Sequence, residues 1–239
     1  MTILGLFDSI VNSNDVGMGA VHVKPQSRWE QERKEGKNKR MKSIIETAGK
    51  VFSRKGFEKT TMQDIADEEN IGIATVFRYF PKKDNLIIAV AVNILEGYLS
   101  VFQSVASMNG TCLEKVEKLF DHFISDVEPE NLEYTQLLEA FESYASTSLG
   151  ELGNYQDYIE VRKKIVDVLS IIVEEGMQDG SIRSDNSIKD VLAAVINAFG
   201  LFSRKLSLFK RIPFLNDDLA PSDQLAIIKK IFMDYIRAR

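Results

Sequence analysis

The chain of 239 residues has one cysteine, Cys112, and only two histidines, His22 and His122. A single cysteine cannot form an internal disulfide, and it fits a protein of the reducing cytoplasm, which is the expected location. The two histidines lie far apart in the sequence, and a lone histidine on a helix is usually structural. These shortages predict no metal or cofactor site built on cysteine or histidine.

Long hydrophobic runs and catalytic signatures are also missing. No uninterrupted apolar run reaches the roughly 18 residues that a membrane span needs. The N-terminal stretch MTILGLFDSIVNSNDVG has no positively charged start and no small-residue cleavage site, so neither secretion nor a membrane partner is expected. The chain has no glycine-rich phosphate loop, H-E-x-x-H, cysteine cluster or G-x-S-x-G, and we therefore expect no enzyme and no catalytic residues.

Positive charge is scarce overall, because 30 Lys and Arg stand against 35 Asp and Glu and the net charge is −5. That balance alone would argue against nucleic acid as a partner. The charges are unevenly spread, however. Residues 24–83 carry 15 Lys and Arg against nine Asp and Glu, whereas residues 84–239 carry 15 against 24. A positive segment followed by an acidic remainder favours a nucleic-acid contact within residues 24–83.

Residues 60–83, TTMQDIADEENIGIATVFRYFPKK, predict two short helices joined by a tight turn. Thr61 can cap the first helix, and Asp64 three residues later would complete a capping box. Asn70-Ile71-Gly72 supplies turn residues that tolerate a left-handed backbone, and the second helix, Ile73–Phe80, ends before a proline. This order of elements is a helix-turn-helix, whose second helix fits the major groove of DNA.

An amphipathic helix is predicted directly upstream. Apolar residues recur at helical spacing from Met41 to Phe52, which indicates a helix over Lys39–Arg54 that ends at Gly56. Its apolar side can cover the inner faces of the two shorter helices. Residues 37–84 should therefore form one three-helix domain.

At these positions the chain resembles the tetracycline-repressor (TetR) family of one-component bacterial regulators. The matching residues read A-x-x-V-F-S-R-K-G-F at Ala48–Phe57, T-T-M-Q-D-I-A at Thr60–Ala66, I-G-I-A-T-V-F-R-Y-F at Ile71–Phe80 and K-K-D-N-L at Lys82–Leu86. A weaker similarity, E-E-G-x-x-D-G-S-I-R at Glu174–Arg183, looks like a helix end and loop of the family's regulatory region.

The resemblance implies contacts with a double-stranded DNA operator. Thr75 and Arg78 can hydrogen-bond to bases or phosphate, and Ala74 can meet a thymine methyl. Phe77 stands where the family commonly has tyrosine, so the hydroxyl that would bind phosphate is missing and only the ring can make contact. The full set of predicted DNA-binding residues is Lys39, Arg40, Thr61, Gln63, Ile73, Ala74, Thr75, Phe77, Arg78, Tyr79 and Lys83.

After Lys83 the sequence predicts helices throughout and no strands. They are expected over 83–107, 112–127, 132–148, 155–178, 187–209 and from a cap at Ser222 to the C-terminus. The predicted fold class is all-α, with an N-terminal three-helix helix-turn-helix DNA-binding domain followed by a helical-bundle ligand-binding and dimerisation domain. The expected domains are residues 37–84 for DNA binding and residues 85–239 for regulation and dimerisation.

Residues 1–36 are expected to form an N-terminal extension. Its charged part, Arg28–Gly36, is interpreted as a mobile arm or a loosely held helix. The alternative is an extra phosphate or minor-groove contact by Arg33, Lys34, Lys37, Lys39 and Arg40. For the segment Lys37–Arg40, next to the first predicted helix, both interpretations stay open.

Apolar surfaces at Val191–Phe202 and Leu225–Tyr235 would be monomer core in the simplest interpretation. In the resembling family the last two helices form a four-helix interface, which implies a homodimer here. Aromatic and methionine side chains then suit a small apolar or aromatic effector, although such residues are often only core. The candidate ligand residues are Tyr98, Phe102, Phe120, Phe123, Phe141, Tyr144, Tyr158, Met177, Phe199 and Phe202.

The resulting hypothesis is a ligand-responsive DNA-binding transcriptional regulator, a repressor that a small effector releases from a palindromic operator. Two alternatives stay open: a helical protein-interaction module, and a constitutive DNA binder without an effector. Salt-sensitive binding of duplex DNA separates a regulator from an interaction module.

Overall fold

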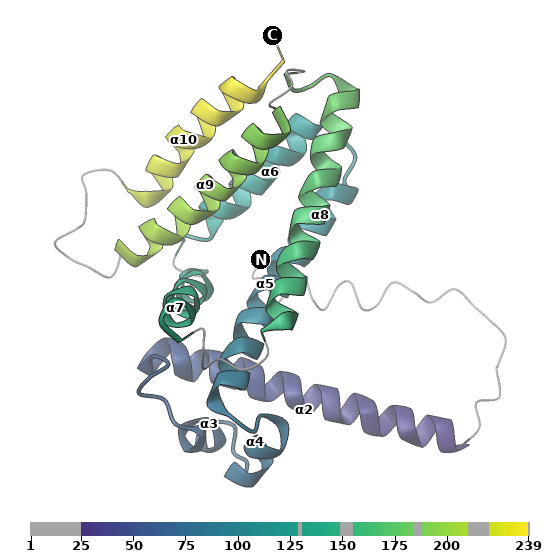
Figure 1. Ribbon diagram of the computed structural model, residues 1–239, viewed down its shortest axis with the longest axis vertical. Coiled ribbons are helices and arrows are strands. Elements are labelled where there is room, and N and C mark those ends of the chain that lie inside the picture. Colours follow the sequence, from purple (N-terminus) through teal and green to yellow (C-terminus); the bar gives the residue numbers. More distant parts are fainter. Residues whose placement is uncertain (1–24, 129–130, 149–154, 184–187, 210–219, 239) are drawn as a thin grey trace. The chain divides into compact units, whose positions relative to one another are not determined.

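The computed structural model describes residues 25–128, 131–148, 155–183, 188–209 and 220–238 (Figure 1). Over these residues the structure is helical, and the predicted all-α class is confirmed. The helices are α2 (Pro25–Lys55), α3 (Met62–Glu68), α4 (Ile73–Tyr79), α5 (Lys83–Ser107), α6 (Cys112–Ser125), α7 (Leu132–Ser148), α8 (Gln156–Asp179), α9 (Ile188–Phe209) and α10 (Pro221–Ile236).

Two helix starts differ from the prediction. Helix α2 begins at Pro25 rather than Lys39, so the described part of the extension continues the first helix of the DNA-binding domain. Its residues are mostly Glu, Gln, Arg and Lys, which favour helix without producing any apolar periodicity. Helix α10 has Pro221 in its first turn and Ala220 as its N-cap, and not a cap at Ser222, because proline suits the first helical position.

The described chain forms two compact units, one ending at Val90 and the other beginning at Ala91, a boundary that falls within α5. In the first unit, α3 packs on both α2 and α4. The apolar side of α2 is buried at Ile44, Ala48, Val51 and Phe52. The ring of Phe52 meets that of Phe57 edge-on, with 5.0 Å between the centroids. This core holds the two short helices of the helix-turn-helix in place.

In the second unit, α6 contacts α8, α9 and α10, and α7 contacts α9. Helices α9 and α10 lie side by side (Figure 1). Aromatic rings fill the centre, with Phe120 and Phe199 4.6 Å apart between centroids and Phe232 of α10 against both. The C-terminal end is joined to the segment after α8, since Arg183 N donates to Ile236 O at 2.9 Å.

Helix α5 departs from the expectation that no segment could cross a membrane. By length and composition alone α5 is apolar enough to span a bilayer, although no uninterrupted apolar run in it reaches 18 residues. Half of its most apolar stretch is buried inside the protein, and core helices of soluble proteins pass the same test. Its apolar character therefore fits a core helix.

Candidate functional site

The predicted helix-turn-helix is present as α3, a short turn and α4. Thr61 is the N-cap of α3, and its hydroxyl accepts from Asp64 N at 3.2 Å while Thr61 N donates to the Asp64 carboxylate at 2.9 Å. This is the predicted capping box. Asn70 adopts the expected left-handed backbone, with φ of 56°, and reverses the chain between the helices. Gly72 caps α4 without any side-chain hydrogen bond.

Salt bridges and hydrogen bonds fix α3 against the end of α2. Lys55 Nζ lies 2.7 Å from Asp64 Oδ1. This hydrogen bond is the largest cause that lowers the pKa of Asp64 to about 2, and the bonds from Thr61 add to it. The cap therefore stays ionised, and its charge faces the positive end of the α3 dipole. Arg54 and Glu68 form a second ion pair between α2 and α3, at 2.7 Å.

A buried carboxylate anchors the turn itself. Glu69 follows the last residue of α3, and its side chain is only 8% exposed. Ser43 and Thr47, one turn apart on α2, both donate their hydroxyl hydrogen to it. Arg40 lies 3.6 Å away from the same carboxylate. These contacts explain how the turn between α3 and α4 is held at a defined place on α2.

Helix α4 buries one side and exposes the other. Val76 is fully buried, whereas Ala74, Phe77 and Arg78 are exposed and share a face at helical spacing. Phe77 is 43% exposed although it is apolar. A face with an exposed aromatic ring, a small residue and a guanidinium can offer apolar contact to thymine methyls and hydrogen bonds to guanine or phosphate.

The remaining predicted DNA-binding residues lie within the same unit. Thr61 and Gln63 are exposed at the start of α3, where the Gln63 amide donates to Asp67 at 2.6 Å. Ile73, Thr75 and Tyr79 are half-buried on α4, while Lys39 and Arg40 are exposed on α2. Every one of these roles stays a prediction.

Lys83 has a structural role that the sequence did not indicate. Its ammonium donates to the carbonyls of Phe57, Thr60 and Glu58, at 2.8, 3.1 and 3.3 Å. All three of its hydrogens can be used in this way, and they hold the loop that leads to the α3 cap. The predicted phosphate contact by Lys83 would therefore compete with carbonyls that it already binds.

The candidate ligand residues separate into three groups in the second unit. Tyr98, Phe102, Phe120, Phe123, Phe199 and Phe202 belong to one hydrophobic cluster. Phe141 and Tyr158 form a separate pair, 4.9 Å apart between ring centroids, and Tyr144 follows on the same helix α7 as Phe141. Met177 is 52% exposed on α8 and lies outside both groups, and its role in ligand binding stays a prediction.

A polar group inside this unit was missed at the sequence level. Tyr98 donates to the Asp126 carboxylate at 2.9 Å, and Thr135 donates to the Asp126 carbonyl at 3.2 Å. Burial raises the pKa of Asp126, while His122 and the bond from Tyr98 act in the opposite direction. His122 lies one turn before Asp126, and its buried Nε2 atom is 3.8 Å from Asp126 Oδ1, too far for a hydrogen bond.

Helices α7 and α9 carry a further set of polar contacts. Gln136 donates to the carbonyl of Ser207 at 2.8 Å, but its buried side-chain oxygen has no partner among the described residues. Glu142 accepts from Arg204 at 2.8 Å, from Tyr158 at 3.1 Å and from Arg162 at 3.3 Å. Arg204 was not singled out from the sequence, because only packing shows that its charge lies beside α7.

Comparisons with known proteins agree with the helix-turn-helix geometry. Residues 44–90 match the family model described as bacterial regulatory proteins, tetR family. The HTH-type transcriptional repressor KstR2 of Mycolicibacterium smegmatis is 26% identical over 147 residues, which are 61% of this chain and 69% of the relative. The HTH-type transcriptional regulator YvkB of Bacillus subtilis is 28% identical over 183 residues, or 72% and 85% of the two chains.

Solved structures share the fold. A transcriptional regulator from Saccharomonospora viridis, solved in complex with choline, has a TM-score of 0.65 at 15% identity and covers 84% of this chain and 100% of its own. KstR2 of Mycobacterium tuberculosis has a TM-score of 0.55 at 16% identity, with 84% and 96% covered. With the family match over residues 44–90, these findings support a TetR-family transcriptional regulator.

Proposed function

We propose that the chain is a ligand-responsive repressor that binds a palindromic DNA operator as a homodimer in the cytoplasm. The observation that carries the proposal is the exposed face of α4, where Ala74, Phe77 and Arg78 lie on a helix that packs against α3. Repression is supported by the relative KstR2, whose name describes a transcriptional repressor.

The dimer is supported by apolar side chains that α9 and α10 leave exposed. Leu201 on α9 is 55% exposed and Ile231 on α10 is 58% exposed, while Ile227 and Tyr235 lie one turn to either side of Ile231. The other halves of the predicted surfaces, such as Phe199 and Leu225, are core. Exposed apolar residues on two adjacent helices are typical of a protein interface. A two-fold dimer presents two α4 helices to successive major grooves, hence a palindromic site.

The dimer has a direct test in Ile231→Glu, which places a charge in the centre of the apolar surface. Sedimentation should show a dimer for the wild type and a monomer for the variant at micromolar concentration. Lys118→Glu on α6, also exposed, is the control for added negative charge and should leave the dimer intact. A wild-type protein that sediments as a monomer and still binds its operator would contradict the proposed dimer.

The effector is proposed to be a small apolar or aromatic molecule bound in the second unit. The aromatic cluster around Phe120, Phe123 and Phe199 supplies apolar contact. Within the described part of the chain, the side-chain oxygen of Gln136 and the buried Nε2 atom of His122 have no hydrogen-bond partner. They supply two polar anchors, since such an atom gains free energy from a ligand that pairs with it. An effector with a hydrogen-bond donor for the Gln136 oxygen and a second polar group for His122, both on an apolar frame, fits this chemistry.

Release is proposed to follow from a shift of α5, which runs through the boundary at Val90 and Ala91. A ligand can change DNA affinity only by binding one arrangement of α5 better than another, and such coupling is typically about 1–3 kcal/mol. Val195→Trp is the test variant, because Val195 is partly buried against the aromatic cluster: it should abolish the response to an inducer and leave operator affinity near that of the wild type. An inducer that saturates the protein without changing operator affinity would contradict the release mechanism.

DNA binding is tested on the sequence that flanks the protein's own gene. Fluorescence anisotropy should show salt-sensitive binding that exceeds binding to a shuffled duplex of equal length. Ala74→Glu places a carboxylate on the exposed face of α4 and should abolish specific binding, whereas Lys118→Gln on α6 should not. Equal binding by Ala74→Glu and wild type would show that α4 does not contact DNA.

A further inference from the structure

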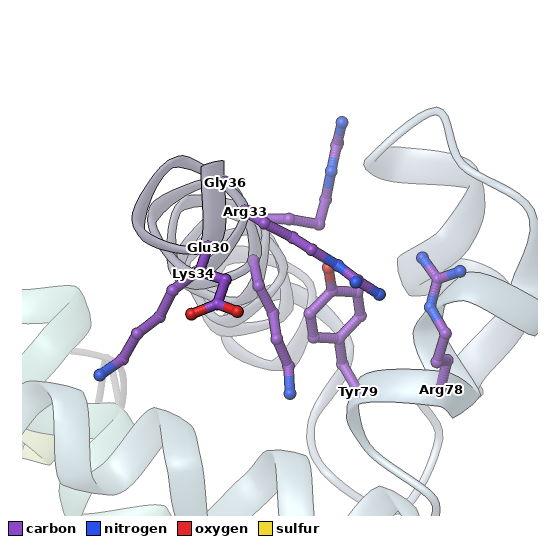
Figure 2. A pocket seen from close by; sticks show the side chains of 8 residues that line it. Glu30, Arg33, Lys34, Gly36, Arg78 and Tyr79 are labelled. Carbon is purple, nitrogen blue, oxygen red and sulfur yellow. The ribbon is translucent and has the colours of Figure 1, made fainter. Parts of the chain in front are cut away.

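The described part of the N-terminal extension forms one wall of a charged cleft. The cleft has a volume of about 760 Å³ and lies between the first half of α2 and the end of α4 (Figure 2). Its lining residues are Glu30, Arg33, Lys34, Gly36, Lys37, Arg40, Arg78 and Tyr79. All of them belong to the unit that carries the helix-turn-helix.

Helical spacing explains why these α2 residues meet α4. Arg33, Lys37 and Arg40 follow one another at intervals of four and three residues, so they project from one side of the helix. Gly36 lies between them without a side chain, and a Cβ atom placed there would meet nothing within 4 Å. The opposite wall is formed by Arg78 and Tyr79 from the last turn of α4, and the side chain of Arg33 extends toward Tyr79 (Figure 2).

The cleft holds an excess of positive charge. Five cationic side chains line it together with one carboxylate, that of Glu30. Among the described residues, Arg40 alone of the five has an ion pair, with Glu69 at 3.6 Å. Arg33 and Arg78 instead stack over aromatic rings, those of Trp29 and Tyr79, at 5.6 and 5.5 Å. Cations held close together without anions repel one another, and an anionic partner would relieve this repulsion.

We propose that this cleft binds the sugar-phosphate backbone of operator DNA beside the bases that α4 contacts. The proposal rests on DNA binding by α4. Arg78 belongs both to the exposed face of α4 and to the cleft, so the two surfaces are continuous. The positive groups from Arg33 to Arg40 extend about 10 Å along α2, at 1.5 Å per residue. That reach fits a row of phosphates, since duplex DNA carries one charge per about 1.7 Å of its axis.

Two consequences distinguish the cleft from the rest of the interface. Phosphate contacts carry no sequence information, so the cleft adds affinity without changing base preference. It also lengthens the contacted DNA, so an operator with flanking base pairs should bind more tightly than one trimmed to the recognised bases. The α2 residues from Arg33 to Arg40 thereby act as a second DNA contact, and not as a mobile arm.

The test compares the double variant Arg33→Gln/Lys37→Gln with the wild type on flanked and trimmed operators. Loss of two phosphate contacts should reduce the slope of log affinity against log salt concentration by about 1.8. The ratio of wild-type affinity to variant affinity should then fall about 12-fold when the salt concentration is raised from 50 to 200 mM. Glu30→Gln removes the carboxylate that opposes phosphate and should tighten binding. Lys50→Gln, exposed on α2 outside the cleft, is the matched control and should behave as wild type.

Three results would overturn the proposal. These are an unchanged salt slope in the double variant, a change in its base preference, or equal affinity of wild type for flanked and trimmed operators. Circular dichroism of the double variant confirms that α2 stays helical, so that lost affinity reports lost contacts. Failure of DNA binding by α4 has a separate signature, because the wild type would then bind specific and shuffled duplexes equally in every experiment.

Discussion

Replacing Lys83 with methionine tests how the DNA-binding unit is held together. The substitution keeps most of the side-chain length and removes the ammonium that donates to Phe57, Thr60 and Glu58. The bonds to Phe57 and Thr60 are partly buried, and each carbonyl left without its donor costs about 1 kcal/mol or more. Water can replace the bond to the exposed carbonyl of Glu58. The expected loss is therefore about 2 kcal/mol.

Hydrogen exchange measured by mass spectrometry can locate this loss. A change of about 2 kcal/mol alters an opening equilibrium roughly 30-fold, so amides of residues 57–68 should exchange about 30 times faster in Lys83→Met. Lys82→Met is the matched control, because Lys82 is exposed one residue earlier and carries the same charge. It should leave exchange near the wild-type rate.

The two lysine variants also separate a structural role from a phosphate contact. Equal protection of residues 57–68 in both variants would refute the structural role of the Lys83 ammonium. If Lys83 contacts phosphate as well, its variant should lower the salt slope of DNA binding by about 0.9. A destabilised Lys83→Met with an unchanged salt slope would assign this residue to folding alone.

Three further substitutions test other parts of the structure. Thr61→Ala removes the capping box and should cost about 1 kcal/mol in urea denaturation, whereas Thr61→Ser should cost little. Asp126→Asn should change the pH dependence of thermal unfolding. Because burial raises the pKa of Asp126 above its ordinary value of 3.8, wild-type stability relative to the variant should be greatest below pH 3.8 and fall as pH rises through the raised pKa. Parallel curves for the two proteins from pH 3 to 7 would contradict this. Gly176→Ala should destabilise the second unit by about 1–3 kcal/mol, since its Cβ atom would lie 2.5 Å from Cys112 Sγ, whereas Gly200→Ala meets only ordinary contacts and should not. Equal melting temperatures for the two glycine variants would contradict the close packing of α6 and α8.

The helix-turn-helix was predictable because local chemistry determines it. A capping threonine, an asparagine in the left-handed region and a proline after α4 each act within a few residues, and the structure confirms the cap and the turn. The early start of α2 was not predictable by the same means. Its first turns carry charge without apolar periodicity, and helix propensity was the one indication available.

The interior of the second unit depends on contacts that only folding brings together. Tyr98 and Asp126 lie 28 residues apart and share a hydrogen bond, which no local pattern indicates. The spacing of His122 and Asp126 was a weak indication, since residues four apart meet on a helix. The exposure of Met177 was not predicted, because apolar character was weighed alone. Its helical neighbours Ser170 and Glu174 are polar and exposed, and they mark that side of α8 as surface.

Selection of bound sequences from a random duplex library is the most direct test of the central claim, sequence-specific DNA binding by a dimer through α4. The account predicts an enriched inverted repeat whose half-sites lie about one helical turn apart or somewhat more. Arg78→Ala, tested on the same library, should relax the preference at defined positions within each half-site. Enrichment of no motif, or of a motif that Arg78→Ala leaves unchanged and that lacks two-fold symmetry, would contradict the account.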